Sequence, residues 1–463
     1  MAFLLVFAAS GAFELTIDPT GNNFAAFADD DDDDGGDDDD DDSGAGGSDR
    51  GGSRSSDDSY SGSIQRGGGA SEGPTLLRRL FQTEPPASPP RRNAPVPLPE
   101  FAANEIVTFG LTEADLTALL AQGYAVLETA DLPAFQTTSR RLSVPRGLSL
   151  PQARDIVRAL PSGQDADFNH FYRSGQGFAP DCRGVDCPAR NSLSWPEFPE
   201  RRGTCGSATP IGMIDTGINP EHDTFRDARL TVERLGKEDR RASRAQHGTA
   251  VAALLVGAPG TRSPGLVPGA KLLAVDAFYR SGADERADVF TLLGGLDLLA
   301  DANVQVINLS LAGPPNTVLE RAVTRLVNER DIVLVAAAGN SGPRAEAEYP
   351  AAYDPVIAVT AVDRDGAIYR RAIQGAHIDV AAPGVDVWTA ASISGARTKT
   401  GTSFAVPFVT AAIAMLREAR PDLRVAEIAD TLRAMANDLG ESGQDPVFGA
   451  GLLNIDGLCR API

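Results

Sequence analysis

Short apolar runs alternate with amphipathic segments over the carboxyl-terminal part of the chain. Runs of strand length lie at 211–215, 271–277, 304–310, 332–338 and 356–362. Between them, segments such as 287–302 and 317–328 carry apolar residues at helical spacing. Strands that alternate with helices predict an α/β domain built on a doubly wound, mostly parallel sheet. We assign residues 174–463 to this domain.

A smaller pattern precedes it, over residues 101–173. Strand-like runs lie at 105–109, 124–128, 137–144 and 165–172, and helix-like runs lie at 111–121 and 149–160. Ser149 stands where a helix cap is expected. The order β-α-β-β-α-β predicts a small α+β domain with a ferredoxin-like fold.

Residues 28–100 lack any apolar periodicity. Two Asp runs, Asp29–Asp34 and Asp37–Asp42, are followed by Gly/Ser-rich and Pro-rich sequence. Such a segment repels itself and predicts a disordered leader. The runs lack the Gly and Glu spacing of an ordered calcium loop, so a structural calcium site is not indicated and we expect no required cofactor.

Residues 1–27 begin with an apolar stretch followed by small residues, which is typical of a signal segment although it lacks a basic start. The stretch is too short to span a bilayer, and no other run qualifies as a transmembrane anchor. We expect a protein that is secreted, periplasmic or at the cell surface.

Three short motifs place one Asp, one His and one Ser in the predicted α/β domain. Asp215 ends the first strand, His247 opens an apolar helix, and Ser403 lies at the start of another helix. A hydroxyl needs an imidazole to take its proton and a carboxylate to orient that imidazole. The three residues therefore predict nucleophilic catalysis by Ser403.

Two further segments suit the same chemistry. Asn340 follows the strand at 332–338, where its amide could donate a hydrogen bond to the oxyanion of a tetrahedral intermediate. The strand at 304–310 leads into a segment of mostly small residues, Ser310, Leu311, Ala312 and Gly313. Small residues allow the backbone to contact an extended peptide.

Together these motifs resemble those of the subtilase family of serine endopeptidases, over about residues 207–456. The resemblance implies a triad of Asp215, His247 and Ser403, with Asn340 as oxyanion donor and Ser310–Gly313 as the strand that pairs with substrate. It also implies that residues 101–173 are an inhibitory propeptide, although an unrelated α+β binding domain would show the same pattern. Ala253 and Ala312 stand where the family usually has Gly, which leaves the size of the substrate pocket open.

Other readings remain. Asp-Thr-Gly is also an aspartic-protease signature, but the second loop that such an enzyme needs is represented only by Asp-Ser-Gly at 42–44, in low-complexity sequence. A catalytically silent domain of the same fold is a further alternative. A zinc protease is disfavoured because no His-Glu-x-x-His occurs.

Charge and cysteine content bear on partners. The formal charge of −21 includes twelve negatives from the Asp runs, and no basic footprint for nucleic acid is present. We expect protein or peptide substrates, the chain's own propeptide as inhibitor, and a monomer. Four cysteines suit two disulfides in an exported protein. Among three pairings we predict Cys182–Cys187 and Cys205–Cys459.

By the family resemblance, Glu348, just before Tyr349-Pro350, occupies the base of the pocket for the residue that precedes the scissile bond. A carboxylate there would select Arg or Lys. Arg173, at the end of the propeptide-like segment, is then a candidate self-cleavage point. The alternative is that Glu348 points to solvent.

Overall fold

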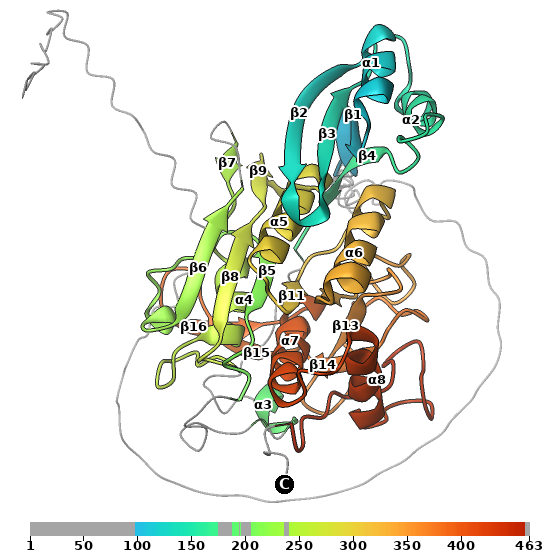
Figure 1. Ribbon diagram of the computed structural model, residues 1–463. Coiled ribbons are helices and arrows are strands. Elements are labelled where there is room, and N and C mark those ends of the chain that lie inside the picture. Colours follow the sequence, from blue (N-terminus) through green and yellow to red (C-terminus); the bar gives the residue numbers. More distant parts are fainter. Residues whose placement is uncertain (1–97, 175–187, 194, 196–204, 236–239, 459–463) are drawn as a thin grey trace, which may run out of the picture. The chain divides into compact units, whose positions relative to one another are not determined.

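The computed structural model describes residues 98–174, 188–193, 195, 205–235 and 240–458 (Figure 1). The predicted signal segment and almost all of the predicted leader lie outside the described residues. None of the helices within these ranges is long and apolar enough to cross a membrane.

Residues 98–174, here called the N-terminal module, have four antiparallel strands and two main helices. The sheet order is β2-β3-β1-β4, the ferredoxin-like order. Helix α2 begins with a capping box between Ser149 and Gln152, as its sequence suggests. The elements are β1 (Phe101–Phe109), α1 (Glu113–Ala121), β2 (Ala125–Leu132), the short helix η1 (Pro133–Phe135), β3 (Thr137–Ser143), α2 (Leu150–Arg158) and β4 (Asp167–Tyr172).

Residues 205–458 are built on a seven-stranded parallel sheet of order β14-β13-β12-β11-β5-β8-β6. The predicted α/β fold class is therefore confirmed. The central strands are buried on both faces. Their sequences are therefore mostly apolar along their whole length and do not alternate with polar residues, as is usual in parallel sheets. The strands are β5 (Ile211–Asp215), β6 (Arg229–Arg234), β8 (Lys271–Asp276), β11 (Val306–Leu309), β12 (Val333–Ala337), β13 (Ile357–Val362) and β14 (Val380–Pro383).

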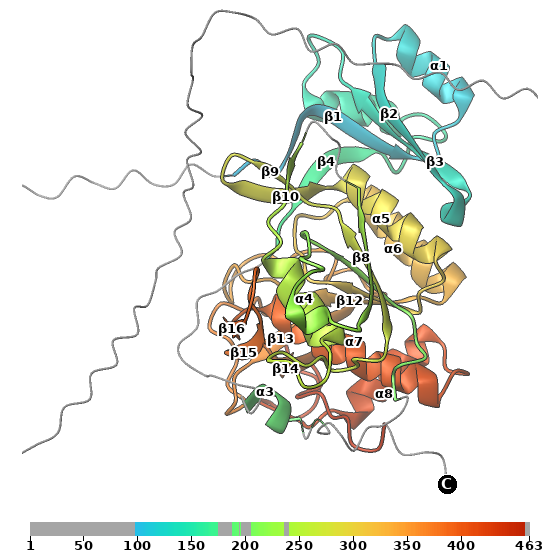
Figure 2. The same ribbon diagram turned by 90° about the vertical axis from the view of Figure 1, so that its left-hand side faces the viewer.

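Two pairs of helices pack together around this sheet, α4 with α7 and α5 with α6 (Figure 2). The long helix α7 runs beside four of the strands and is buried over most of its length. The helices are α4 (His247–Val256), α5 (Val289–Asp301), α6 (Thr317–Arg330), α7 (Thr402–Ala419) and α8 (Val425–Met435), with the short α3 (Pro188–Asn191) and η2 (Asp223–Phe225).

The N-terminal module is joined to the parallel-sheet domain by strand pairing. Strand β4 pairs with β10 (Asp284–Asp288), and β10 continues through β9 (Tyr279–Ser281) to β7 (Arg241–Ala242). The module's sheet lies over α5 and α6 (Figure 1). The second half of β1 is buried on both faces, because Ile106 packs in the module's own core and Val107 packs in the large core of the neighbouring domain.

The strands that the sequence pattern did not predict are short or polar. They include β6, β14, the β9–β10 hairpin and a second hairpin of β15 (Val387–Ala390) and β16 (Ala396–Lys399). Strands of this kind have no alternation long enough to distinguish them from loops.

Candidate active site

Asp215 and His247 meet at the carboxyl edge of the parallel sheet. Asp215 is the last residue of β5, and His247 is the first residue of α4. Nδ1 of His247 lies 2.7 Å from Oδ1 of Asp215, and the two side chains are 0% and 1% exposed. A carboxylate in this position fixes the orientation of the imidazole ring, so that Nε2 points away from Asp215.

The small residues of the two motifs hold this pair together. The N–H of Gly248 donates to Oγ1 of Thr216 at 2.9 Å, and the N–H of Asn219 donates to Oγ1 of Thr249 at 2.8 Å. A Cβ on Gly248 would lie 2.2 Å from the carbonyl oxygen of Thr216. The Gly and Thr of His-Gly-Thr are therefore required for the close approach of the two loops.

Ser403 is the second residue of α7, and Pro407 shapes its surroundings. Pro407 has no N–H, so the Ser403 carbonyl four residues earlier receives no helical hydrogen bond from it. That carbonyl instead accepts the Ser310 hydroxyl at 2.8 Å, and Asn308 donates to the Ser310 oxygen at 2.9 Å. The proline thus makes room for a bond that ties the end of β11 to the first turn of α7.

The Ser403 hydroxyl donates to the carbonyl of Ser310 at 3.3 Å, and not to His247. Nε2 of His247 is buried and has no hydrogen-bond partner among the described residues. The His247 ring lies beside Phe404, with ring centroids 5.2 Å apart, so the imidazole is held next to the start of α7. Catalytic hydrogen bonds are often loose before substrate binds. The Ser403 hydroxyl must turn from Ser310 to use Nε2 as a base.

Asn340 lies just beyond the end of β12 and faces the same turn of α7. Its Oδ1 accepts the N–H of Thr402 at 3.0 Å and the Thr402 hydroxyl at 3.2 Å. Because the oxygen is held by Thr402, the amide nitrogen is free to donate to another group. Thr402 is a functional residue that the sequence pattern did not single out.

The segment Ser310–Gly313 pairs with the end of the N-terminal module. The N–H of Arg173 donates to the carbonyl of Ala312, and the N–H of Ala312 donates to that of Arg173, both at 2.9 Å. Gly313 is required here because a Cβ would lie 2.6 Å from the Tyr172 ring. Leu311 is buried. An open cleft of about 810 Å³ adjoins this pairing, lined by residues of both parts, Asn340 and Glu348 among them.

Glu348 turns its carboxylate toward this cleft. Oε1 accepts the Ser341 hydroxyl at 2.5 Å, and a Cβ on Gly339 would lie 2.3 Å from Oε2. The carboxylate therefore lies against the backbone that leads into Asn340. Burial raises the pKa of Glu348, opposed by the Ser341 hydrogen bond. Within the part of the chain that the structure describes, no cation pairs with it.

The two departures from the family pattern lie in different places. Ala253 is fully buried in α4, within the core, and does not line the cleft. Ala312 lines the cleft and pairs with Arg173. Only the second extra methyl bears on substrate.

A further carboxylate, Asp276 at the end of β8, supports the Asp215 loop from behind. The Ser243 hydroxyl donates to Oδ1 of Asp276 at 2.9 Å and accepts the N–H of Gly217 at 2.7 Å. Burial raises the pKa of Asp276 to about 6. No sequence pattern pointed to Asp276, because Ser243 and Asp276 belong to no shared motif.

No cluster of His, Cys, Asp and Glu among the described residues has the geometry of a metal site. Cys205 is disulfide-bonded, and the other three cysteines lie outside the described residues. The predicted pairing of Cys205 with Cys459 and of Cys182 with Cys187 therefore stays a prediction.

Comparison with known proteins identifies the family. A family model described as the subtilase family matches residues 206–451. Subtilisin BL of Lederbergia lenta is 32% identical over 261 residues, which cover 56% of this chain and 93% of the relative. Subtilisin DY of Bacillus licheniformis is 32% identical over 264 residues, with the same two coverages. The minor extracellular protease Epr of Bacillus subtilis is 30% identical over 259 residues, 55% of this chain and 39% of the relative.

A solved structure agrees on the fold. The crystal structure of fervidolysin from Fervidobacterium pennivorans, described as a keratinolytic enzyme related to subtilisin, has a TM-score of 0.63 at 21% identity. The match covers 78% of this chain and 62% of that one. At this identity the likeness concerns the fold alone. The length and identity of the subtilisin matches decide the assignment: the chain belongs to the subtilase family and is a subtilisin-like serine peptidase.

Proposed function

We propose that the protein hydrolyses peptide bonds through an acyl-enzyme formed on Ser403. The observation that carries the proposal is the buried 2.7 Å contact between Asp215 and His247, which leaves Nε2 of His247 without a partner beside the start of α7. The Asp215 carboxylate forms its hydrogen bond with an imidazole and not with a second carboxylate, which disfavours the aspartic-protease reading.

In this mechanism the Ser403 oxygen attacks the carbonyl carbon of the scissile bond. His247 takes the hydroxyl proton on Nε2, and Asp215 stabilises the imidazolium through Nδ1. The oxyanion accepts hydrogen bonds from Nδ2 of Asn340 and from the Ser403 N–H, which has no helical partner at the start of α7. The imidazolium then protonates the leaving amine, and water attacks the acyl-enzyme with His247 again as base.

A fluorophosphonate probe tests this chemistry. The probe is expected to label Ser403 in the processed enzyme, and Ser403→Ala is expected to lower turnover by about 10⁶-fold, the scale of nucleophile loss in this family. An enzyme with an acid optimum that is unaffected by Ser403→Ala would support the aspartic-protease alternative. Absence of both labelling and hydrolysis would favour a catalytically silent binding domain.

We also propose that the chain is made as an autoinhibited proenzyme. Strand β4 and Arg173 pair with both backbone edges of the cleft, β10 on one side and Ala312 on the other, which is the position of an extended substrate. Tyr172 at the end of β4 is fully buried, and its hydroxyl donates to the Pro314 carbonyl at 2.9 Å. A module bound in this way excludes substrate.

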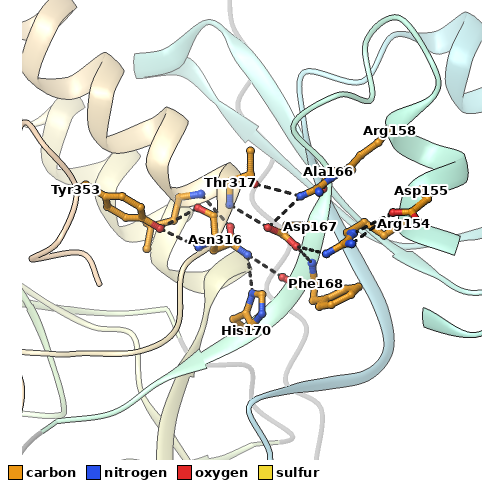
Figure 3. Close-up of polar contacts among 11 residues, drawn as sticks. Arg154, Asp155, Arg158, Ala166, Asp167, Phe168, His170, Asn316, Thr317 and Tyr353 are labelled. Carbon is orange, nitrogen blue, oxygen red and sulfur yellow. Dashed lines mark hydrogen bonds and ion pairs between the residues drawn. The ribbon is translucent and has the colours of Figure 1, made fainter. Parts of the chain in front are cut away.

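A polar network at the start of α6 supports the same role (Figure 3). Oδ2 of Asp167 accepts the N–H of Thr317 at 3.0 Å, and Nδ2 of Asn316 donates to the Phe168 carbonyl at 2.9 Å. The same amide lies 2.9 Å from Nδ1 of His170. Burial lowers the pKa of His170, which keeps that nitrogen free to accept. These contacts favour an inhibitory module over an independently placed binding domain.

Export is part of the proposal. It is supported by the signal-like start of the sequence and by the disulfide at Cys205, which suits an oxidising compartment. The relative from Bacillus subtilis is named as an extracellular protease. Fractionation of the native host, with the processed enzyme expected outside the cytoplasm, tests this part.

A further inference from the structure

The side chain of Arg173 is held by a carboxylate of the parallel-sheet domain. Nε of Arg173 donates to Oδ1 of Asp284 at 2.9 Å, and Nη2 donates to Oδ2 at 3.0 Å. This is the two-bond geometry in which a guanidinium recognises a carboxylate most specifically. Asp284 is the first residue of β10, the strand that pairs with β4, and is 8% exposed. The backbone of the same arginine pairs with Ala312.

The register of the backbone pairing between Arg173 and Ala312 shows which substrate position Arg173 occupies. Ala312 lies two residues after Ser310, and the Ser310 carbonyl is the group that the Ser403 hydroxyl contacts. In an antiparallel pair, two steps back along one strand correspond to two steps forward along the other. A substrate bound as Arg173 is bound therefore brings the second residue after its arginine opposite Ser310, beside the nucleophile. The arginine is the third residue before the scissile bond.

The register changes the expectation for self-cleavage. Cleavage directly after Arg173 would require Arg173 to face Ser310, whereas its backbone bonds go to Ala312. By the same register, processing of the chain itself is expected after residue 175 and not after residue 173.

Asp284 also forms an ion pair with Arg286, two residues further along β10. Nη1 of Arg286 lies 3.1 Å from Oδ2 of Asp284, but this nitrogen makes no hydrogen bond among the described residues. In the unprocessed chain the Arg286 guanidinium is stacked over the ring of Phe171, at 4.0 Å, and this ring leaves together with Arg173 when the module is released. Both hydrogen bonds to Asp284 from a side chain therefore come from Arg173. A nearly buried carboxylate that loses them favours any ligand that restores them.

We propose that Asp284 is a specificity-determining residue that selects substrates with arginine at the third position before the scissile bond. The proposal rests on the proposed function, because it assumes that substrate occupies the path of β4 and Arg173. Lysine is expected to be a weaker ligand, since it cannot form the two-bond fork. The site is separate from Glu348, which lies against Gly339 and concerns the residue directly before the scissile bond.

The test uses the processed enzyme obtained from the full chain and peptides that differ only by Arg, Lys or Gln at one position. Every peptide carries a constant Arg two residues after the varied position, so that the preference expected from Glu348 is the same in all of them. We expect kcat/KM for the Arg peptide to exceed that for the Gln peptide by about tenfold to a hundredfold, the range for charge-assisted hydrogen bonds. Lys is expected to fall between them. Mass spectrometry is expected to find cleavage after the second residue that follows the arginine.

In Asp284→Asn the Arg-to-Gln ratio is expected to fall to about twofold or less, whereas Glu233→Gln, which removes an exposed carboxylate on β6, retains it. Fluorophosphonate labelling of Ser403 in Asp284→Asn shows that the variant is folded. An Arg-to-Gln ratio near one in the wild type, an unchanged ratio in Asp284→Asn, or cleavage directly after the varied arginine instead of after the constant one overturns this inference and leaves the proposed function standing. Absence of labelling and of hydrolysis in the wild type overturns both.

Discussion

The side-chain oxygen of Asn340 is held by the backbone N–H of Thr402, the residue that precedes the nucleophile, at 3.0 Å. This bond fixes which end of the amide faces the cleft. Asn340→Leu is therefore expected to lower kcat by about 10²–10³, the magnitude established for the corresponding donor in a member of this family, with little change in KM. Steady-state kinetics on a peptide substrate measures both.

Asn340→Asp is the matched control for that experiment. The carboxylate can still accept from Thr402 but cannot donate to an oxyanion. Its kcat is expected to fall at least as far as that of Asn340→Leu. If Asn340→Asp retained wild-type kcat, Asn340 would not be the oxyanion donor.

Asp167 is expected to contribute to inhibition in trans. The module of residues 101–173 has an apolar core of its own, so it is a reasonable inhibitor to add to the processed enzyme. Asp167→Ala removes the acceptor for the Thr317 N–H at the start of α6 and an ion pair with Arg158. Loss of a carboxylate that accepts a hydrogen bond at the start of a helix is expected to weaken the binding free energy by about 1–2 kcal/mol. The inhibition constant is therefore expected to rise about tenfold.

Asp155→Ala supplies the control for this titration, because Asp155 is exposed on α2 and pairs with Arg154 within the module. Its inhibition constant is expected to match that of the wild-type module. Circular dichroism of each variant checks that the module is folded. A folded wild-type module that fails to inhibit at micromolar concentration would leave the unrelated binding domain as the better reading.

Glu348 is expected to favour Arg or Lys directly before the scissile bond. Glu348→Gln removes the charge but keeps an acceptor for Ser341, so the Arg-to-Leu ratio in kcat/KM is expected to drop at least tenfold. Burial raises the pKa of Glu348, and the charged form exists above that pKa. The wild-type ratio is therefore expected to decline as pH falls through the raised value, and the Gln variant to show no such decline.

A peptide library scanned between pH 5 and pH 9 measures this ratio. Preference for Phe or Leu over Arg in the wild type at pH 8 would show that Glu348 does not set specificity, as would an unchanged ratio in Glu348→Gln.

Asp276 is expected to reduce stability at neutral pH. Burial raises the pKa of Asp276 from 3.8 to about 6, so the native state favours the protonated carboxyl. This preference stabilises the folded protein fully below pH 3.8, and the stabilisation is lost as the pH rises through 6 and the buried group becomes charged. Asp276→Asn keeps an acceptor for Ser243 and for the N–H of Phe278. In a Ser403→Ala background, which prevents self-digestion, the substitution is expected to raise the free energy of unfolding at pH 7.5 by about 1–3 kcal/mol.

Urea titrations at several pH values test the sign of that effect. The gain is expected to shrink as pH falls through 6 and to be smallest near pH 4. Destabilisation by Asp276→Asn at pH 7.5, or a difference that does not vary with pH, would contradict the assignment.

The motifs and strands of the core could be predicted from sequence because each is a local pattern. Strand β5 has the predicted bounds, and His247 and Ser403 open helices as their surroundings indicate. The bond between Arg173 and Asp284 had no such signal. It joins two residues 111 positions apart, and Asp284 lies in a short polar hairpin whose strands the pattern did not reveal. The orientation of Glu348 likewise depends on Gly339 and Ser341 and not on the Tyr-Pro pair that drew attention to it.

The pairing of β4 with β10 and of Arg173 with Ala312 has a consequence for the targets of the enzyme. Both walls of the cleft offer main-chain groups, so the space between them accepts polypeptide only as a single extended strand. A target segment already paired in its own sheet, or wound in a helix, must first lose its internal hydrogen bonds. The rate of attack on a native protein would then follow how often each segment unfolds locally, and the fragments released would map the least stable stretches of the target.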